Sequence, residues 1–265
     1  GCRMKLPLYQ VDAFTAEVFK GNPAAVCFLD AWLDDARLLA VAAENNLSET
    51  AFLVPMEGGF ELRWFTPVTE VALCGHATLA SAFVLFRRRG WTTPSITFRT
   101  RRSGNLTVVQ REDLIEMDFP ARPPSPQDPP GKSLSEALGV QPKEFFLSAE
   151  DALVVVEDEA IVRNLQPDIP ALARTPYRGT IVTARGKSCD FVSRFFAPRV
   201  GVAEDPVTGS AHCVLTPYWS RRLGRKKLHA QQVSRRGGEL FCEDRGARVG
   251  IAGRAVLYLE GEIAV

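Results

Sequence analysis

The stretch EDPVTGSAH, residues 204–212, places two acids and a Gly-Ser pair just before a run of apolar residues. A helix that starts at Gly209 would present backbone N–H groups without intrahelical partners and about half a positive charge, which together favour anion binding. A carboxylate near such a helix start is stabilised as the anion, whereas burial raises its pKa, and proton-transfer catalysts use this balance. Asp205 is therefore a candidate acid–base residue. Asp205 or Thr208 as a helix cap, and Ser210 as a capping hydroxyl, are the structural alternatives.

A second candidate segment is CGHA, residues 74–77, at the start of another apolar run. His76 follows Gly75 directly; a histidine in an apolar run is often simply buried, but its place at a presumed helix start favours a role in the site. Cys74 could be a nucleophile or an acid–base thiol, because thiol pKa values fall at helix starts, or a small buried hydrophobe. The chain has 3 histidines and no ligand set at the usual metal spacing, so we expect no metal site.

The elements that must position these residues occur twice. The segment FELRWFTP, residues 60–67, returns as FVSRFFAP, residues 191–198, at an offset of 131. After three extra residues the match resumes at an offset of 134, where Gly75 corresponds to Gly209 and Ala77 to Ala211. Ordered recurrence of this kind predicts a duplication and two halves with the same core design.

Hydrophobic periodicity predicts a mixed α/β chain. Alternating, β-branched or aromatic runs predict strands, and the ranges are 8–14, 50–55, 60–66, 95–100, 105–111, 114–119, 152–157, 179–184, 190–197 and 249–259. Helices are expected over 34–46, 75–90, 133–139 and 209–224. Residues 75–90 are apolar on nearly every face, which places this helix inside a sheet, and Pro217 should bend its repeat partner. The Pro-rich stretch from Pro120 to Pro130 predicts an extended linker between the halves.

Composition excludes several classes of function. The chain has 32 Lys and Arg against 31 Asp and Glu, so no global field attracts nucleic acid or an anionic membrane. No apolar stretch is long enough to span a bilayer, and the 6 cysteines are far apart, which favours reduced thiols and a cytoplasmic location. Phosphate-binding glycine motifs and the GxSxG motif of serine hydrolases are also missing from the sequence.

Six blocks of the sequence together resemble the phenazine biosynthesis-like (PhzF-like) family. They are VDAF (11–14) with GNP (21–23), NLSET (46–50), FTP (65–67) with CGHA (74–77), and EDPVTGSA (204–211). LRWFTP, CGHATLAS and RRGGEL are most similar to the animal phenazine biosynthesis-like domain-containing, or MAWD-binding, group. The resemblance covers essentially the whole chain.

The resemblance implies a diaminopimelate-epimerase-like fold, in which two similar halves each wrap a curved sheet or barrel around a central helix, with the site between them. We expect halves at residues 4–118 and 119–265, with a last strand that can cross back to the first half. The family's glutamate falls on Glu49, its histidine on His76, its aspartate on Asp205 and its serine on Ser210. From the sequence alone, Glu49 would be an exposed acid at a strand start.

The leading hypothesis is a cofactor-independent isomerase that moves a proton within a small carboxylate-bearing metabolite. Glu49 would shuttle the proton, His76 and Asp205 would orient the substrate or relay protons, and Gly75, Gly209 and Ser210 would bind its carboxylate. Two alternatives stay open: a catalytically idle binding or regulatory protein that acts through protein partners, and a racemase or epimerase that uses Cys74. Related epimerases use one thiol from each half. Here, at the offset of 134, the residue that corresponds to Cys74 in the second half is Thr208. The resemblance also allows a homodimer.

Overall fold

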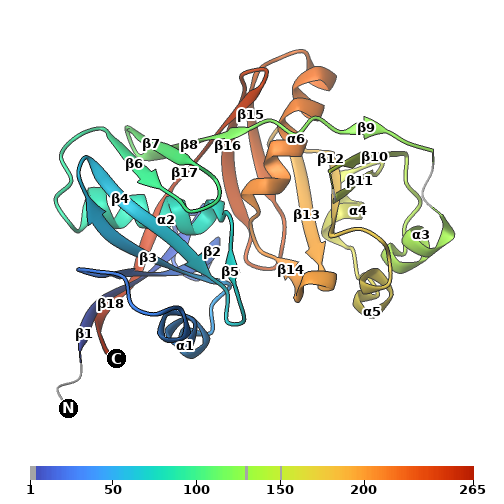
Figure 1. Cartoon of the computed structure of the whole chain (residues 1–265). Coiled ribbons are helices and arrows are strands. Elements are labelled where there is room, and N and C mark those ends of the chain that lie inside the picture. The colour runs from blue at the N-terminus through green and yellow to red at the C-terminus, as the bar shows by residue number, and fades with distance from the viewer. Residues whose placement is uncertain (1–3, 129–130, 150) are drawn as a thin grey trace. The chain divides into compact units, whose positions relative to one another are not determined.

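The structure, a computed structural model, describes residues 4–128, 131–149 and 151–265 (Figure 1). The chain divides into two compact units: unit 1 comprises Gly1–Asp118 and Ala252–Val265, and unit 2 comprises Phe119–Ile251. Residues 252–265, which the sequence analysis assigned to the C-terminal half while allowing the last strand to cross back, belong to unit 1. Strand β18 (Ala255–Ala264) pairs there with β1 (Lys5–Ala13) in antiparallel fashion. Cys2 and the end of the expected linker, residues 129–130, lie outside the described residues.

Unit 1 is a curved sheet in which most paired strands are consecutive in the sequence. Its further strands are β2 (Asn22–Phe28), β3 (Glu49–Met56), β4 (Gly59–Phe65), β5 (Glu70–Val71), β6 (Ser95–Arg99), β7 (Asn105–Arg111) and β8 (Leu114–Pro120). Strand β2 runs parallel to β3, and β4 runs parallel to β6, whereas the pairs β1–β2, β3–β4, β6–β7 and β7–β8 are antiparallel. The short strand β5 returns antiparallel beside the end of β4.

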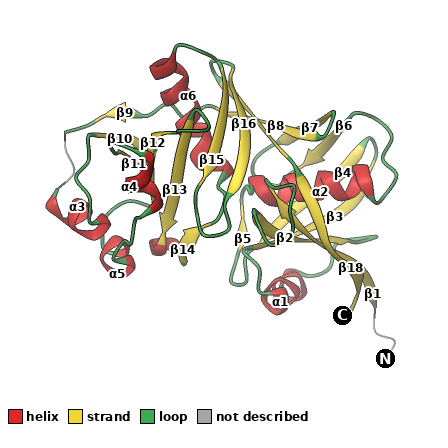
Figure 2. Cartoon of the chain, turned by 180° about the vertical axis from the view of Figure 1, so that it is seen from behind, coloured by secondary structure: helices red, strands yellow, loops and turns green. Residues whose placement is uncertain are grey.

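Helix α2 (Gly75–Arg87) runs through the middle of unit 1, with strands around it (Figures 1 and 2). It packs against β1, β2 and β3, and residues on all of its faces are buried, as the apolar run predicted. Helix α1 (Asp35–Asn45) lies outside the sheet, where Leu38 packs with Phe52 and Phe65. The surrounding sheet therefore fixes the position of α2, including its first residues.

Unit 2 repeats this plan with additions. Strands β12 (Gly179–Arg185) and β13 (Phe191–Ala197) pair antiparallel like β3 and β4, and β13 runs parallel to β15 (Lys227–Gln232) as β4 does to β6. Strand β14 (Val202–Asp205) corresponds to β5, β16 (Gly238–Asp244) to β7, and α6 (Gly209–Leu223) to α2. The remaining elements are β9 (Ser125–Pro126), α3 (Lys132–Leu138), β10 (Glu144–Ser148), β11 (Asp151–Val155), α4 (Glu159–Arg163), α5 (Ile169–Ala173), the 3-10 turn η1 (Pro198–Val200) and β17 (Arg248–Gly253).

Several elements escaped the sequence analysis for physical reasons. Strand β2 reads NPAAVCF and is buried at six of its seven positions, so it has no polar–apolar alternation to detect. Helices α4 and α5 have five residues each, too few for a helical period to be visible. The single strand expected over 249–259 is two strands, β17 and β18, which are separated at Arg254.

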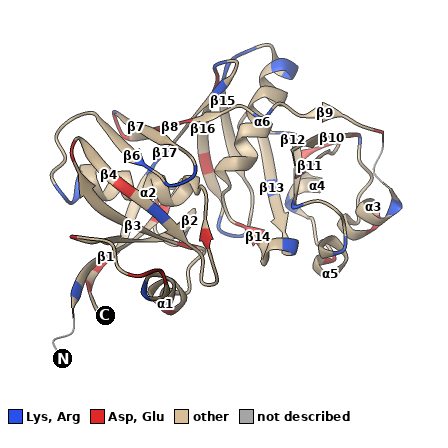
Figure 3. Ribbon diagram, viewed as in Figure 1, with Lys and Arg blue, Asp and Glu red and all other residues tan. Residues whose placement is uncertain are grey.

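The distribution of charge fits the near-neutral composition. Figure 3 shows acidic and basic residues interspersed along the elements of both units. Among the described residues, no helix is both long enough and apolar enough to cross a lipid bilayer.

Candidate active site

Glu49 and His76, which are 27 positions apart in the chain, come together in unit 1. Asn46 follows the last residue of α1 as its C-cap in a left-handed conformation (φ 51°), and the chain then enters β3 at Glu49, opposite Ala24 of the parallel strand β2. His76 is the second residue of α2. Its Nε2 atom lies 3.2 Å from Glu49 Oε2, and the two side chains are 5% and 18% exposed. The Glu49 side chain is thus partly exposed, although the oxygen that faces His76 is buried, and the ring is enclosed.

The environment of His76 keeps its ring neutral. Burial lowers the His76 pKa to about 3, although a hydrogen bond to the backbone carbonyl of Pro23 acts in the opposite direction. The ring must donate an N–H to this carbonyl, so its other nitrogen carries a lone pair. Nδ1 lies 3.3 Å from Cys74 Sγ. The imidazole therefore stands between a carboxylate and a thiol as a neutral ring near neutral pH.

The motifs VDAF and GNP flank the connection between β1 and β2, and this connection positions the Pro23 carbonyl next to His76. Strands β1 and β2 meet at the pair Ala13–Asn22, just outside the turn that holds Gly21. Gly21 has φ +65°, and a Cβ atom there would lie 2.1 Å from the Ala13 carbonyl oxygen. Only glycine tolerates both conditions, so the turn requires it. Pro23 then follows on β2 with its carbonyl directed to His76.

The two central helices begin in the same way. Cys74 and Thr208 occupy the N-cap positions in extended conformations, and neither caps its helix with a side-chain hydrogen bond. The fourth helical residue bonds back to the cap carbonyl in each case: Thr78 Oγ1 donates to Cys74 O at 2.6 Å, and His212 Nδ1 donates to Thr208 O at 2.8 Å. Gly75 and Gly209 are the first helical residues, as expected, and Ser210 is the second residue of α6.

In unit 2, the Asp205 side chain is held by Thr208. Thr208 Oγ1 donates to Asp205 Oδ2 at 2.5 Å. The amide of Gln232, on β15, fixes this loop: Oε1 accepts from Thr208 N at 2.8 Å, and Nε2 donates to Asp205 O at 2.8 Å and to Thr208 Oγ1 at 3.1 Å. The capping role left open for Thr208 is therefore wrong for its side chain, because the hydroxyl is engaged with the aspartate.

Gln232 escaped the sequence analysis and is expected to matter for stability. Its side chain is fully buried, so Gln232→Leu removes the hydrogen bonds to Thr208 N and to Asp205 O, and each lost buried hydrogen bond costs about 1–3 kcal/mol. We expect urea unfolding to show unit 2 destabilised by about 2 kcal/mol or more. The half-buried neighbour Gln231, replaced by Leu, serves as the control. Equal unfolding midpoints for the two variants would contradict the role given to Gln232.

A paired arginine and glutamate anchor the approach to each central helix. Arg63 Nε and a terminal nitrogen donate to both carboxylate oxygens of Glu70, at 2.8 and 2.7 Å, and Arg194 binds Glu204 in the same manner at 2.7 and 2.9 Å. Each guanidinium also lies over the aromatic ring two residues further along its strand, at 4.9 Å for Phe65 and 5.0 Å for Phe196. Glu70 and Glu204 each stand five residues before the helix start and are related by the offset of 134. The sequence repeat thus contained both members of each arginine–glutamate pair, but the sequence analysis did not single the pairs out.

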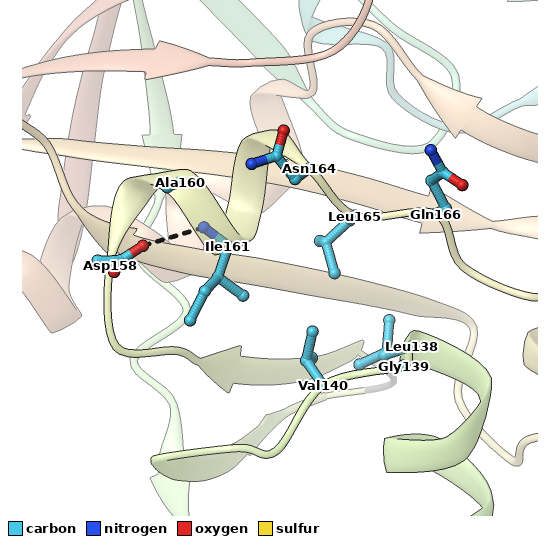
Figure 4. Close-up of a pocket in the computed structure, with 9 residues that line it drawn as sticks. All are labelled: Leu138, Gly139, Val140, Asp158, Ala160, Ile161, Asn164, Leu165 and Gln166. Carbon is cyan, nitrogen blue, oxygen red and sulfur yellow. Dashed lines mark hydrogen bonds between the residues drawn. The ribbon is translucent and has the colours of Figure 1, made fainter.

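Two surface hollows are lined by residues other than the candidate catalytic ones. One, of about 490 Å³ in unit 2, has Leu138, Val140, Ile161 and Leu165 around it together with Asp158, Asn164 and Gln166 (Figure 4). The other, of about 360 Å³ in unit 1, lies beside Trp32, Glu61, Arg99 and Arg101. Neither contains a predicted site residue, so the chemistry of the side chains, and not the volume of a hollow, locates the candidate site.

The chain is similar to known proteins over nearly its entire length. The family model described as phenazine biosynthesis-like protein (PhzC-PhzF) matches residues 11–261. An uncharacterized isomerase of Pseudomonas aeruginosa is 54% identical over 98% of this chain and 99% of its own length. The expected likeness to the animal group is confirmed by mouse phenazine biosynthesis-like domain-containing protein 2, at 46% identity with 98% and 99% covered.

Solved structures confirm the expected fold class. The crystal structure of a phenazine biosynthesis protein of the PhzF family from Enterococcus faecalis has a TM-score of 0.96 at 47% identity, with 99% of this chain and 100% of that chain covered. A hydroxyproline epimerase from Agrobacterium vitis shares the fold alone, with a TM-score of 0.64 at 11% identity over 100% and 94% of the two chains. The isomerase names of the bacterial relatives support an isomerase activity. By the family match and by these identities, the chain belongs to the phenazine biosynthesis-like (PhzF) family.

Proposed function

We propose that this chain is a cofactor-independent isomerase that moves a proton within a small carboxylate-bearing metabolite. The observation that carries the proposal is the contact between Glu49 and His76, in which a carboxylate on a partly exposed side chain lies 3.2 Å from a buried, neutral imidazole. The carboxylate is the base that takes a proton from carbon and returns it elsewhere. General acid–base catalysis of this kind typically contributes about 10²- to 10⁴-fold in rate.

His76 supports this role by being uncharged. A buried imidazolium next to Glu49 would form an ion pair and stabilise the carboxylate as the anion, which would weaken it as a base. With its pKa at about 3, the ring instead accepts or donates hydrogen bonds without a net charge. It can therefore position Glu49 or relay a proton while leaving the basicity of the carboxylate intact.

Two of the three predicted binding residues lie in unit 2. Gly209 and Ser210 open α6 without a side-chain cap, so its first N–H groups can bind a substrate carboxylate. Asp205 is held in place by Thr208 and Gln232, which suits a residue that must orient a ligand. That these residues act on the same substrate as Glu49 is part of the proposal, and it rests on the family pattern and the duplication.

The proposal is tested by proton exchange with solvent. The protein is incubated in D₂O with a panel of small cyclic and amino-acid-derived carboxylates, and proton NMR follows loss of carbon-bound hydrogen and formation of isomers. We expect at least one compound to exchange or isomerise with no added metal or organic cofactor. A panel in which no compound exchanges, and none raises the melting temperature, would argue against the proposal and for the binding-protein alternative.

The contact between Cys74 Sγ and His76 Nδ1 favours a second candidate, a racemase or epimerase in which the thiol is the acid or base. The N-cap position of Cys74 is the place where a thiol can be activated by a helix. The Cys74→Ser variant separates the two functions, because a glutamate-based isomerase keeps its turnover and a thiol-based racemase loses it.

A further inference from the structure

The Glu49, Cys74 and His76 side chains together offer a metal-binding set that the spacing of these residues in the sequence does not reveal. One ligand atom from each lies within 4.8 Å of the other two. The donors are a thiolate sulfur, an imidazole nitrogen and a carboxylate oxygen, a set that suits zinc-like cations and not magnesium or calcium, which prefer oxygen alone. We propose that this cluster binds a thiophilic divalent cation of the Zn²⁺ class.

The distances need only small adjustments. Around tetrahedral zinc, with bonds of about 2.0–2.3 Å, neighbouring ligand atoms are about 3.5 Å apart. Cys74 Sγ lies 3.3 Å from His76 Nδ1, and Glu49 Oε2 lies 3.2 Å from the other ring nitrogen, Nε2. Because one nitrogen of the ring binds the cation, the set closes when the Cys74 or Glu49 side chain rotates toward that nitrogen, and all three ligand atoms start within 4.8 Å of one another. Cys74 and His76 themselves sit at the rigid start of α2.

The surroundings of the ring also match those of a ligand histidine. Histidines that bind metals almost always donate their second ring N–H to a carboxylate, a carbonyl or water, which fixes the tautomer. His76 donates one ring N–H to the Pro23 carbonyl, which leaves its other nitrogen available to a cation. Three protein ligands with one partly exposed edge leave a fourth position for water or another small ligand.

Binding converts the Cys74 S–H bond into a metal–sulfur bond and releases the proton to the buffer. A bound cation is also coordinated by the Glu49 carboxylate and by a nitrogen of the His76 ring, so neither group can then transfer a proton. Where the proposed function holds, metal binding and proton transfer therefore exclude each other, and the cation is an inhibitor. The binding itself is independent of the proposed function.

The test uses Co²⁺ as a spectroscopic probe on the whole chain, treated with EDTA and then freed of it. We expect one Co²⁺ per chain, a thiolate-to-cobalt charge-transfer band in the near ultraviolet, tetrahedral d–d bands in the visible, and loss of all bands on adding Zn²⁺. The Cys74→Ser variant should lose the charge-transfer band, and Glu49→Gln should weaken binding about tenfold or more.

Cysteines elsewhere provide the controls. Cys189→Ser removes a half-buried thiol of unit 2, and Cys2→Ser removes the thiol near the N-terminus; both variants should keep the full spectrum. Circular dichroism checks that each variant is folded. The absence of a charge-transfer band in the folded wild-type chain, or its survival in Cys74→Ser, would overturn the inference. Neither outcome depends on the exchange assay, so a failure here is distinct from a failure of the proposed isomerase activity.

Discussion

Glu49→Gln is expected to lower turnover, or solvent exchange into an identified substrate, by about 10²-fold or more while leaving the chain folded. Glutamine keeps the shape of the side chain and can still form hydrogen bonds, but its amide cannot take a proton from carbon. Because Glu49 is 18% exposed at the first position of β3, the replacement should disturb neither the β2–β3 pairing nor the core. The substrate concentration at half-maximal rate should change little, since the anion-binding helix starts are untouched.

Two further variants sharpen this experiment. Glu49→Asp retains a carboxylate but withdraws it by one methylene, and a displacement of about 1 Å can cost about 10²-fold in rate. Glu57→Gln removes an exposed carboxylate from the turn between β3 and β4 and should leave turnover unchanged. A Glu49→Gln protein with wild-type turnover, on a substrate that wild type isomerises, would remove Glu49 from the mechanism and leave the thiol of Cys74 as the base to examine.

The sequence alone could predict the duplication and the central helices, because both leave local signals. The paired segments at 60–67 and 191–198 became β4 and β13, and the apolar runs after Gly75 and Gly209 became α2 and α6. These signals depend on residues close together in the chain. Hydrophobic periodicity and repeated motifs are therefore the parts of this fold that sequence reasoning recovers best.

The geometry of the candidate site could not be predicted in the same way. Glu49 and His76 meet because β2 and β3 pair in parallel and α2 packs on both, and a parallel pairing leaves no mark at either residue. Only the family resemblance singled out Glu49. Gln232 is a single amide in an ordinary strand sequence, and its three hydrogen bonds depend on where β15 falls beside β13. Such side chains become recognisable only once non-local pairing is known.

Replacing the buried arginine of unit 1 is expected to have the largest effect on stability. The Arg63 side chain is 2% exposed and binds both oxygens of Glu70, which is 15% exposed, so Arg63→Met leaves a mostly buried carboxylate without its main cation. Breaking a buried pair by removing one partner typically costs about 3–5 kcal/mol. Arg63→Met should lower the free energy of unfolding of unit 1 by about this amount at neutral pH, measured by urea unfolding. Lys5→Met, which removes a pair whose side chains are 71% and 61% exposed, should change it by less than about 1 kcal/mol.

The dependence on pH identifies the cause. The hydrogen bond and charge of Arg63 hold the Glu70 pKa below its ordinary value of 4.5, although burial opposes the shift. The pair therefore contributes its full stability above the unfolded-state pKa and loses it as the pH falls through the lower folded-state value. The difference between wild type and Arg63→Met should be constant from pH 8 to about pH 5.5 and should shrink below about pH 4.5. The double variant Arg63→Met with Glu70→Gln should recover part of the loss, because no buried charge then remains unpaired. A deficit that persists unchanged at low pH and in the double variant would show that packing of the arginine against Trp32 and Phe65, and not the charge pair, supports this part of the fold.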